Sequence, residues 1–135
     1  MQEILTSKQF REKYIEKVPV KGLKYGNVRI TNEYGKFDSK GEWKWFQKLL
    51  FRQNVLKEIT DLKPHEKFVL VPKNGKVRAV TYTSDATYIE LKTGLKIVTD
   101  FKSGITKTKD SFVIKRKMML EKYEIEIKIV EKADL

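Results

Sequence analysis

Residues 83–102 read TSDATYIELKTGLKIVTDFK, with two strand-like runs on either side of Lys92-Thr93-Gly94. Alternating apolar and β-branched residues around a short glycine-containing turn predict a β-hairpin. A two-residue loop at Lys92-Thr93 places Asp85 directly opposite Asp100. A three-residue loop ending at Gly94 shifts the pairing by one residue, and the same alignment then needs a bulge in the longer strand.

The opposed carboxylates have a chemical and a structural interpretation. Side chains directly opposite each other on neighbouring strands lie with Cβ atoms about 4.5–5.5 Å apart, close enough to bind one hard cation. Lys102 lies two residues after Asp100 and therefore shares its face of the sheet. The alternative is that Asp85 and Asp100 are ordinary strand-end acids that pair with lysines. Spacing alone does not decide between these interpretations.

Outward from this hairpin, the pattern predicts an α/β fold with a mixed sheet. Residues 68–71 and 77–82 flank Asn74-Gly75, which predicts another hairpin with a type I′ turn. A strand at 95–102, a helix at 111–120 and a strand at 123–130 predict a right-handed βαβ crossover.

Upstream, two helices are expected, one over 6–17 and one from Ser39 to Gln53-Asn54. Thr6-x-x-Gln9 and Ser39-x-x-Glu42 are capping-box patterns. Residues 17–29 are rich in Lys and Arg and predict an irregular basic arm. We expect a single domain, made of an N-terminal helix and arm at 1–36 and a core at 37–135.

Composition limits the kinds of partner and of metal site that we expect for this protein. Lys and Arg outnumber Asp and Glu by 29 to 18, for a net charge of +11, which favours a polyanionic partner such as nucleic acid over an anionic membrane. The chain has no cysteine and one histidine, His65, so a catalytic metal would need carboxylate ligands, as Mg²⁺ or Mn²⁺ does. No apolar run is long enough to span a membrane, so we expect a cytoplasmic protein.

Several ordered motifs resemble one family. They are Lys24-Tyr25-Gly26-Asn27, Phe37-Asp38-Ser39-Lys40-Gly41-Glu42, Tyr82-x-x-Asp85 with Tyr88, Val98-x-Asp100-Phe101-Lys102-Ser103-Gly104, and Phe112-x-Ile114-Lys115-x-Lys117. This order resembles a phage-borne family of uncharacterised proteins in the PD-(D/E)XK nuclease superfamily, over roughly residues 24–130. The superfamily includes Holliday-junction resolvases and endonuclease subunits of transposases.

The resemblance implies a restriction-endonuclease-like core in which Asp85 and Asp100 bind Mg²⁺ and Lys102 assists catalysis. It also implies that Glu42 takes part in catalysis and metal binding, like the helix glutamate of archaeal resolvases. On an ideal helix Glu42 faces the packed side, where an unpaired charge is costly, although its capping-box position explains it without catalysis. The chain departs from the family pattern at Ala86, where Phe is expected, and at His65, where Gln is commoner.

Basic and aromatic residues supply candidate nucleic-acid contacts. A Lys-rich helix is usually a solvated face, but here it follows the proposed catalytic strand, so we expect phosphate contacts with Lys115 nearest the site. Tyr25, Trp43 and Trp45 could stack on bases, although tryptophans are more often core residues. His65 is a weak general-base candidate. The expected DNA contacts are Lys24, Arg29, Lys107, Lys109, Lys115, Arg116 and Lys117.

The sequence thus favours a Mg²⁺-dependent DNA endonuclease that acts in phage or mobile-element recombination, replication or packaging. We expect a homodimer that selects branched DNA by shape, in a host cytoplasm if the gene is phage-borne, with a recombination or packaging protein as a possible partner. The alternatives are a non-catalytic nucleic-acid-binding protein on a nuclease-like fold and an interaction protein that inhibits a host factor.

Overall fold

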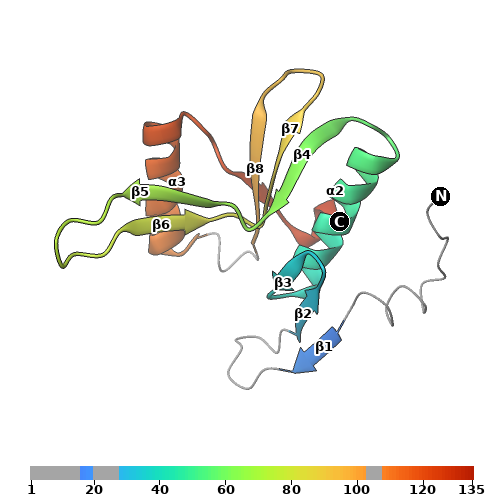
Figure 1. Ribbon diagram of the computed structural model, residues 1–135, viewed down its shortest axis with the longest axis horizontal. Coiled ribbons are helices and arrows are strands. Elements are labelled where there is room, and N and C mark those ends of the chain that lie inside the picture. The colour runs from blue at the N-terminus through green and yellow to red at the C-terminus, as the bar shows by residue number, and fades with distance from the viewer. Residues whose placement is uncertain (1–15, 20–27, 103–107) are drawn as a thin grey trace. The chain divides into compact units, whose positions relative to one another are not determined.

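The computed structural model describes residues 16–19, 28–102 and 108–135 (Figure 1). The chain divides into two compact units, Met1–Lys44 and Trp45–Leu135, and the boundary falls inside helix α2 (Lys40–Asn54). The helix expected over 6–17 lies outside the described residues except for its last two positions, which begin a strand.

The first unit contains an antiparallel sheet of β1 (Glu16–Pro19), β2 (Val28–Asn32) and β3 (Gly35–Phe37), in that order. The prediction of an irregular arm over 17–29 was therefore wrong at both ends, while residues 20–27 lie outside the described part. The physical reason is burial, because Ile30 and Phe37 face each other across β2 and β3 and both are buried. A strand this short gives too few alternations to recognise in the sequence.

Helix α2 begins as predicted after Ser39. The Ser39 hydroxyl accepts a hydrogen bond from the Glu42 N–H at 3.2 Å, and the Glu42 carboxylate accepts one from the Asp38 N–H at 3.0 Å. These bonds satisfy N–H groups at the helix start, as a capping box does, although the carboxylate reaches one residue further back than usual. The predicted cap is thus confirmed with this small difference.

The second unit contains a four-stranded sheet in the order β4-β7-β8-β9 and a separate hairpin, β5–β6. Strands β7 and β8 are antiparallel, whereas β8 and β9 are parallel and are connected through α3, which confirms the mixed sheet and the βαβ unit. The elements are β4 (Ile59–Pro64), β5 (Lys67–Val71), β6 (Val80–Thr83), β7 (Ala86–Glu90), β8 (Lys96–Phe101), α3 (Asp110–Tyr123), β9 (Lys128–Val130) and a 3-10 turn, η3 (Lys132–Asp134).

Strand β9 is shorter than the predicted 123–130. Helix α3 continues to Tyr123 and ends at Glu124, whose φ of 56° is left-handed, so the chain reaches the sheet only at Lys128. The alternation of Ile125 and Ile127 with glutamates is typical of a strand. In the structure Ile127 instead belongs to the buried core cluster, and Ile125 packs against that cluster.

The predicted strand 83–91 is interrupted at Ser84-Asp85, where the chain leaves the β5–β6 hairpin and enters the four-stranded sheet. The segment between β4 and β5 makes the opposite crossing at His65-Glu66, from the four-stranded sheet into the hairpin. The His65 N–H donates to the Asp85 carbonyl at 3.2 Å, and the Ser84 N–H donates to the Glu66 carbonyl at 3.0 Å. These bonds hold the two crossings together, and Figure 1 shows the β5–β6 hairpin extending away from β4, β7 and β8.

The turn of the β5–β6 hairpin differs from the expected type I′ turn. Asn74 and Val77 are mutually hydrogen bonded, so the central residues are Gly75 and Lys76. Among residues 74–77 only Gly75 has a positive φ, at 56°. This pattern matches a type II′ turn, which places glycine first. A left-handed φ at Lys76 is thereby avoided.

The core of the second unit lies between the hairpin, α3 and the sheet. Phe68 and Tyr82 stack with ring centroids 6.3 Å apart, and the rest of the cluster comes from all three elements. Within the described part of the chain, no helix is long and apolar enough to cross a membrane. The buried cluster comprises Phe68, Leu70, Tyr82, Val98, Phe112, Met119 and Ile127.

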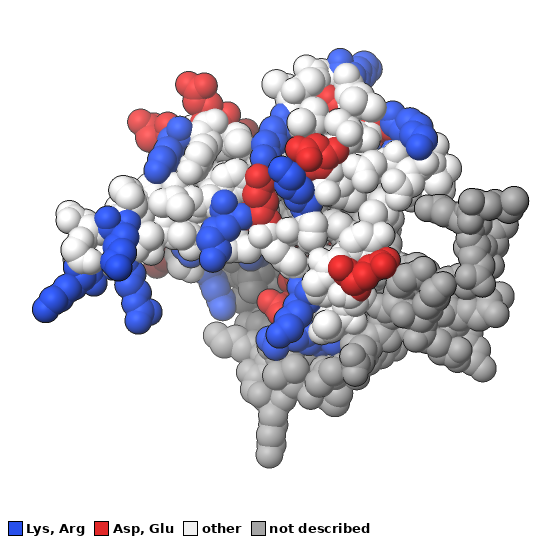
Figure 2. Space-filling model, in the orientation of Figure 1, with Lys and Arg blue, Asp and Glu red and all other residues white. Residues whose placement is uncertain are grey.

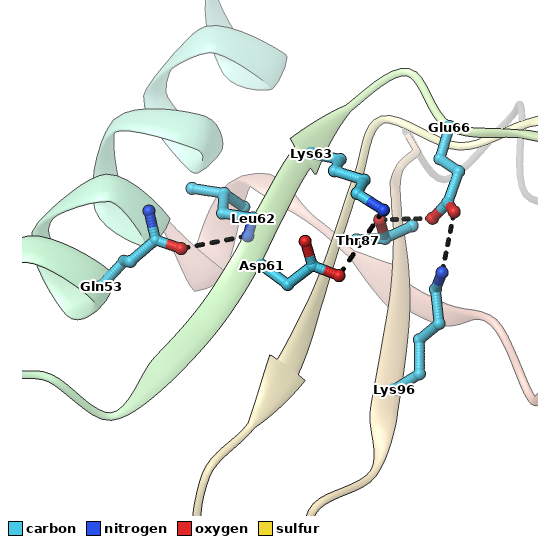
Figure 3. Close-up of polar contacts among 7 residues, drawn as sticks. All are labelled: Gln53, Asp61, Leu62, Lys63, Glu66, Thr87 and Lys96. Carbon is cyan, nitrogen blue, oxygen red and sulfur yellow. Dashed lines mark hydrogen bonds and ion pairs between the residues drawn. The ribbon is translucent and has the colours of Figure 1, made fainter.

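Glu66 connects the crossing to strands β7 and β8 (Figure 3). Its carboxylate accepts a hydrogen bond from the Thr87 hydroxyl at 2.6 Å and pairs with the Lys96 ammonium at 2.8 Å. Burial alone would raise the pKa of Glu66, but the bonds from Lys96 and Thr87 outweigh it and hold the pKa below its usual value. The ionised form is therefore favoured in the folded protein.

Glu66→Gln is expected to lower the free energy of unfolding at pH 7 by about 1 kcal/mol, because it removes one charge-assisted pair. A lowered folded pKa stabilises the protein above the unfolded pKa of glutamate, about 4.3, and this contribution is lost as pH falls through the folded pKa. Urea unfolding of both proteins from pH 7 to 3 should show the difference shrinking below about pH 4. Glu58→Gln, at an exposed pair with Arg52, is the control and should change stability less. A constant difference at all pH values would contradict this account.

Candidate active site at the end of strand β8

Asp85 lies beside Asp100, as the first of the two sequence alignments predicts. Ala86 pairs with Thr99, and immediately before this pair the Asp85 N–H donates to the Thr99 carbonyl at 3.1 Å. The Asp85 carboxylate accepts a hydrogen bond from the Phe101 N–H at 2.6 Å. Asp85 is thus fixed against the peptide bond that follows Asp100.

The loop that sets this register is longer than expected. Glu90 pairs with Leu95, and the Gly94 N–H donates to the Glu90 carbonyl at 2.7 Å, so the turn covers residues 91–94. Gly94 has a φ of 73°, which favours glycine. A four-residue turn centred on Lys92-Thr93 gives the same register as the two-residue loop, so the strand alignment was correct although the loop length was wrong.

Asp100 is an almost fully buried carboxylate with two polar partners. Its residue is 2% exposed. The Tyr82 hydroxyl donates to Asp100 Oδ2 at 2.8 Å, and Lys102 Nζ lies 3.3 Å from Oδ1. Because a buried polar group is costly without partners, the Tyr82 hydroxyl and the Lys102 ammonium offset the cost of burying this side chain.

Tyr82 is a site residue whose role the sequence did not reveal. Burial, reinforced by the negative charges of Asp100 and Asp85, raises the pKa of the Tyr82 hydroxyl well above its usual value. The phenol therefore stays protonated and donates to Asp100. The available signal was the spacing Tyr82-x-x-Asp85, which places a tyrosine on the strand before the crossing.

Lys102 is held from three directions. Its backbone N–H donates to the Val130 carbonyl of β9 at 2.9 Å, and its ammonium lies 4.9 Å from the centre of the Phe112 ring at the start of α3. With the contact to Asp100, these interactions place a partly exposed cation beside a buried anion. The predicted group of Asp85, Asp100 and Lys102 is therefore brought together.

A pocket of about 320 Å³ opens onto Asp100 and Lys102, whereas Asp85 is not among its lining residues. Asp100 and Lys102 contribute its charged wall on the β8 side, and Lys115 contributes a second cation from α3. The two lysine ammonium groups beside hydroxyl donors suit a phosphate ester better than an apolar ligand. The lining residues are Thr81, Tyr82, Thr83, Asp100, Lys102, Ser111, Phe112 and Lys115.

The other predicted DNA contacts are more dispersed than the sequence suggested. Lys109 and Lys117 are exposed on or beside α3, whereas Arg116 pairs with Glu126 at 3.4 Å. Arg29 pairs with Asp38 at 3.3 Å in the first unit. Lys24 and Lys107 lie outside the described residues. Of the members of this set that the structure describes, only Lys115 lines the pocket.

The proposed base-stacking tryptophans are core residues. Trp43 is 2% exposed and packs against Phe37 with ring centroids 5.1 Å apart. Trp45 is 5% exposed, and its indole N–H donates to the Thr99 hydroxyl at 2.9 Å. Neither ring has a face open for a nucleotide base. Tyr25 lies outside the described residues.

Glu42 and His65 have visible structural roles. Glu42 belongs to the first unit and caps α2 as described above. His65 occupies a left-handed conformation at the strand crossing, with a φ of 53°. Within residues 16–19, 28–102 and 108–135, no group of three or more histidine, aspartate or glutamate side chains is arranged to hold a metal ion. Among the described residues, Asp100 is the carboxylate that lines the pocket, and Asp85 lies beside it against the Phe101 N–H.

Tyr82→Phe is expected to lower the free energy of unfolding by about 1–3 kcal/mol, because the Asp100 carboxylate loses a donor inside the protein. Thermal and urea unfolding would measure this. Tyr123→Phe is the matched control, because it also removes a hydroxyl donor. The Tyr123 hydroxyl donates to the Val69 carbonyl at a more exposed position, so its loss should lower the free energy of unfolding by less. Equal effects of the two variants would show that the Tyr82–Asp100 bond has no special importance.

Residues 21–133 match the profile of a family described as "Protein of unknown function (DUF1064)". No curated protein and no solved structure matches the chain.

Proposed function

We propose a function for this chain, which belongs to the DUF1064 family: it is a Mg²⁺-dependent DNA endonuclease with a PD-(D/E)XK-type core. The observation that carries the proposal is the convergence of Asp85, Asp100 and Lys102 at the end of β8, beside a pocket lined by further hydroxyl and cationic groups. The arrangement combines hard oxygen ligands with a fixed positive charge. Hydrolysis of a phosphodiester needs both.

The donor set fits a hard divalent cation. Asp85 Oδ2 is occupied by the Phe101 N–H, and Asp100 is oriented by Tyr82 and Lys102, so both carboxylates are held in place before any ligand binds. Mg²⁺ is commonly held by one or two carboxylates together with substrate phosphates and waters, so a pair is sufficient. Mn²⁺ is expected to substitute. Bound there, the cation would supply Lewis-acid stabilisation of the phosphate charge and lower the pKa of the attacking water.

The chain's own residues would perform the remaining tasks. Lys102 is placed to stabilise developing charge on the phosphoryl oxygens, because its ammonium is partly exposed next to Asp100. Lys115 would contact a neighbouring phosphate from the opposite wall of the pocket. Tyr82 would act as a positioning residue that fixes the Asp100 carboxylate. Glu42 is proposed as an additional ligand on the resemblance to resolvases alone.

The direct test is incubation of the purified protein with linear, single-stranded and four-way-junction DNA in Mg²⁺, Mn²⁺, Ca²⁺ or EDTA. We expect cleavage in Mg²⁺ and Mn²⁺, binding without cleavage in Ca²⁺, and no cleavage in EDTA. Cleavage that persists in EDTA would exclude the proposed mechanism. Binding in every condition with cleavage in none would exclude the nuclease function.

We further propose that the substrate is recognised by shape, as a branched DNA, and that the active form is a homodimer. Lys102 and Lys115 at the pocket would contact phosphates, which carry no base sequence, so recognition would rely on phosphate geometry and deformability. Two symmetric cuts across a junction require two sites related by a two-fold axis. Competition between a four-way junction and a duplex of equal length, with light scattering of the free protein, tests both points. Equal affinities and a monomeric mass would exclude them.

A second candidate, a non-catalytic DNA-binding protein on the same fold, is favoured by one observation. Asp100 already has two protein partners, and the described residues contain no third carboxylate at the pair. Such a protein would bind the same DNA with equal affinity in Mg²⁺ and Ca²⁺. The incubation above distinguishes the two functions.

A further inference from the structure

The β5–β6 hairpin has a distal part that is exposed throughout. All residues from Val71 to Val80 are exposed, and Val77 is 69% exposed. We call residues 71–80 the arm. Burial resumes at the base, where Leu70 and Tyr82 enter the core and the Tyr123 hydroxyl donates to the Val69 carbonyl at 2.7 Å. The arm is therefore an exposed loop, closed near its tip by the Asn74–Val77 bridge, that projects from an anchored two-stranded base.

The arm and its base carry positive charge only. Residues 67–84 contain four basic residues, Lys67, Lys73, Lys76 and Arg78, and no Asp or Glu. Figure 2 shows Lys and Arg side chains gathered at the projecting end of the hairpin. Three of the four lie in or beside the two-residue turn. An arm with this charge is complementary to a polyanion.

The arm is also directly connected to the candidate active site. Strand β6 leads from the arm to Thr81, Tyr82 and Thr83, which line the pocket beside Asp100. Strand β6 itself begins at Val80, and a fully extended segment from Tyr82 to the turn would reach at most roughly 20 Å at about 3.3 Å per residue. This reach is comparable to the diameter of a DNA duplex, so a duplex with one phosphate at the pocket would have a groove within reach of the arm.

We propose that the arm inserts into the major groove of duplex DNA next to the phosphate held at the pocket. The major groove is wide enough for a two-stranded β-ribbon and therefore for a hairpin loop closed by one bridge, whereas the minor groove is about half as wide. Lys73, Lys76 and Arg78 would contact the phosphates that border the groove, and the exposed valines would face the base edges. The inference rests on the proposed DNA substrate and adds the element that binds it.

A second copy of this chain is the other conceivable occupant, through pairing of exposed strand edges. Pro72 lacks a backbone N–H, and lysines on an edge strand oppose such pairing. The arm is thus better suited to an anion than to another strand.

The test uses the full chain in EDTA, so that binding is measured without cleavage. Fluorescence anisotropy with a 30-base-pair duplex is repeated over a range of salt for the wild type and Lys73→Ala/Lys76→Ala/Arg78→Ala. Since each neutralised phosphate contributes about 0.9 to the slope of log K against log salt, the triple variant should reduce the slope by about two to three. Lys44→Ala/Lys92→Ala/Lys132→Ala removes the same charge from other exposed positions and should reduce it by less than one.

A second variant tests the arm without altering the base. Val71 pairs with Val80, so residues 72–79 can be replaced by Asn-Gly, which closes a two-residue turn between paired positions. The wild type should protect guanine N7, a major-groove atom, from dimethyl sulfate, and the shortened protein should not. Light scattering of both proteins reports whether the arm instead joins two copies.

Equal losses in the two triple variants, unchanged protection after excision, no binding by the wild type, or loss of a dimer on excision with intact binding would each overturn the proposal. Binding through the arm by a wild type that never cleaves DNA would leave the arm's role standing and exclude the nuclease function.

Discussion

Replacing Asp85 or Asp100 with asparagine is expected to lower the single-turnover rate of DNA cleavage by at least about 10³-fold, or roughly 4 kcal/mol of activation free energy. Each carboxylate would bind the cation through its negative charge, and an amide of nearly the same size cannot replace that charge. DNA binding should survive, because the basic residues of the arm and α3 are unchanged.

The asparagine variants also separate catalysis from folding. An asparagine oxygen at position 100 can still accept from Tyr82, and one at position 85 can still accept from the Phe101 N–H. Both proteins should therefore fold, which circular dichroism and thermal unfolding would check. Asp61→Asn is the matched control, since Asp61 lies on β4 and pairs with the exposed Lys63, and it should cleave normally. Wild-type cleavage by folded Asp100→Asn would remove this carboxylate from the mechanism.

Replacing Lys102 with methionine should likewise lower cleavage by at least about 10³-fold. Methionine keeps an unbranched apolar side chain but removes the ammonium that lies 3.3 Å from Asp100 and 4.9 Å from the centre of the Phe112 ring. Because transition-state charge on the phosphoryl oxygens would lose its nearest protein cation, the rate should fall while DNA affinity changes little.

Lys115→Met provides a sharp comparison, because Lys115 lines the same pocket from α3. As a phosphate contact it should weaken DNA binding and lower the salt slope by about one, with a cleavage rate at saturating DNA within about tenfold of the wild type. The same loss of rate in both variants would show that Lys102 acts only through general charge.

The strand register at the site could be narrowed to two alternatives because it depends on local pattern. Alternation on both sides of Lys92-Thr93-Gly94 predicts the hairpin, and the observed pairing of Ala86 with Thr99 agrees with the first of the two alignments. The same kind of information predicted the start of α2, where Ser39 and Glu42 satisfy N–H groups within a few residues.

The strand crossing could not be predicted in this way. Ser84 and Asp85 continue a run of β-forming residues, and the break arises because the Glu66 and Thr99 carbonyls accept their N–H groups. Glu66 is far from Ser84 in the sequence, so no local pattern contains this information. The donation from Tyr82 to Asp100 depends on the same crossing.

The burial of the two tryptophans could not be predicted from the local sequence either. One residue separates Trp43 from Trp45 on α2, and an aromatic pair beside basic residues is compatible with either base stacking or packing. Trp45 is buried because Thr99 accepts its indole N–H and in turn donates to the Ala86 carbonyl at 2.8 Å. That chain of bonds depends on the tertiary fold.

Mn²⁺ binding, followed by electron paramagnetic resonance of the free protein, tests the proposed metal site most directly. We predict that the wild type binds Mn²⁺, that Mg²⁺ competes for the same site, and that Asp85→Asn and Asp100→Asn each weaken binding by tenfold or more while Asp61→Asn does not. Equal Mn²⁺ affinity in all four proteins would contradict a metal centre at Asp85 and Asp100.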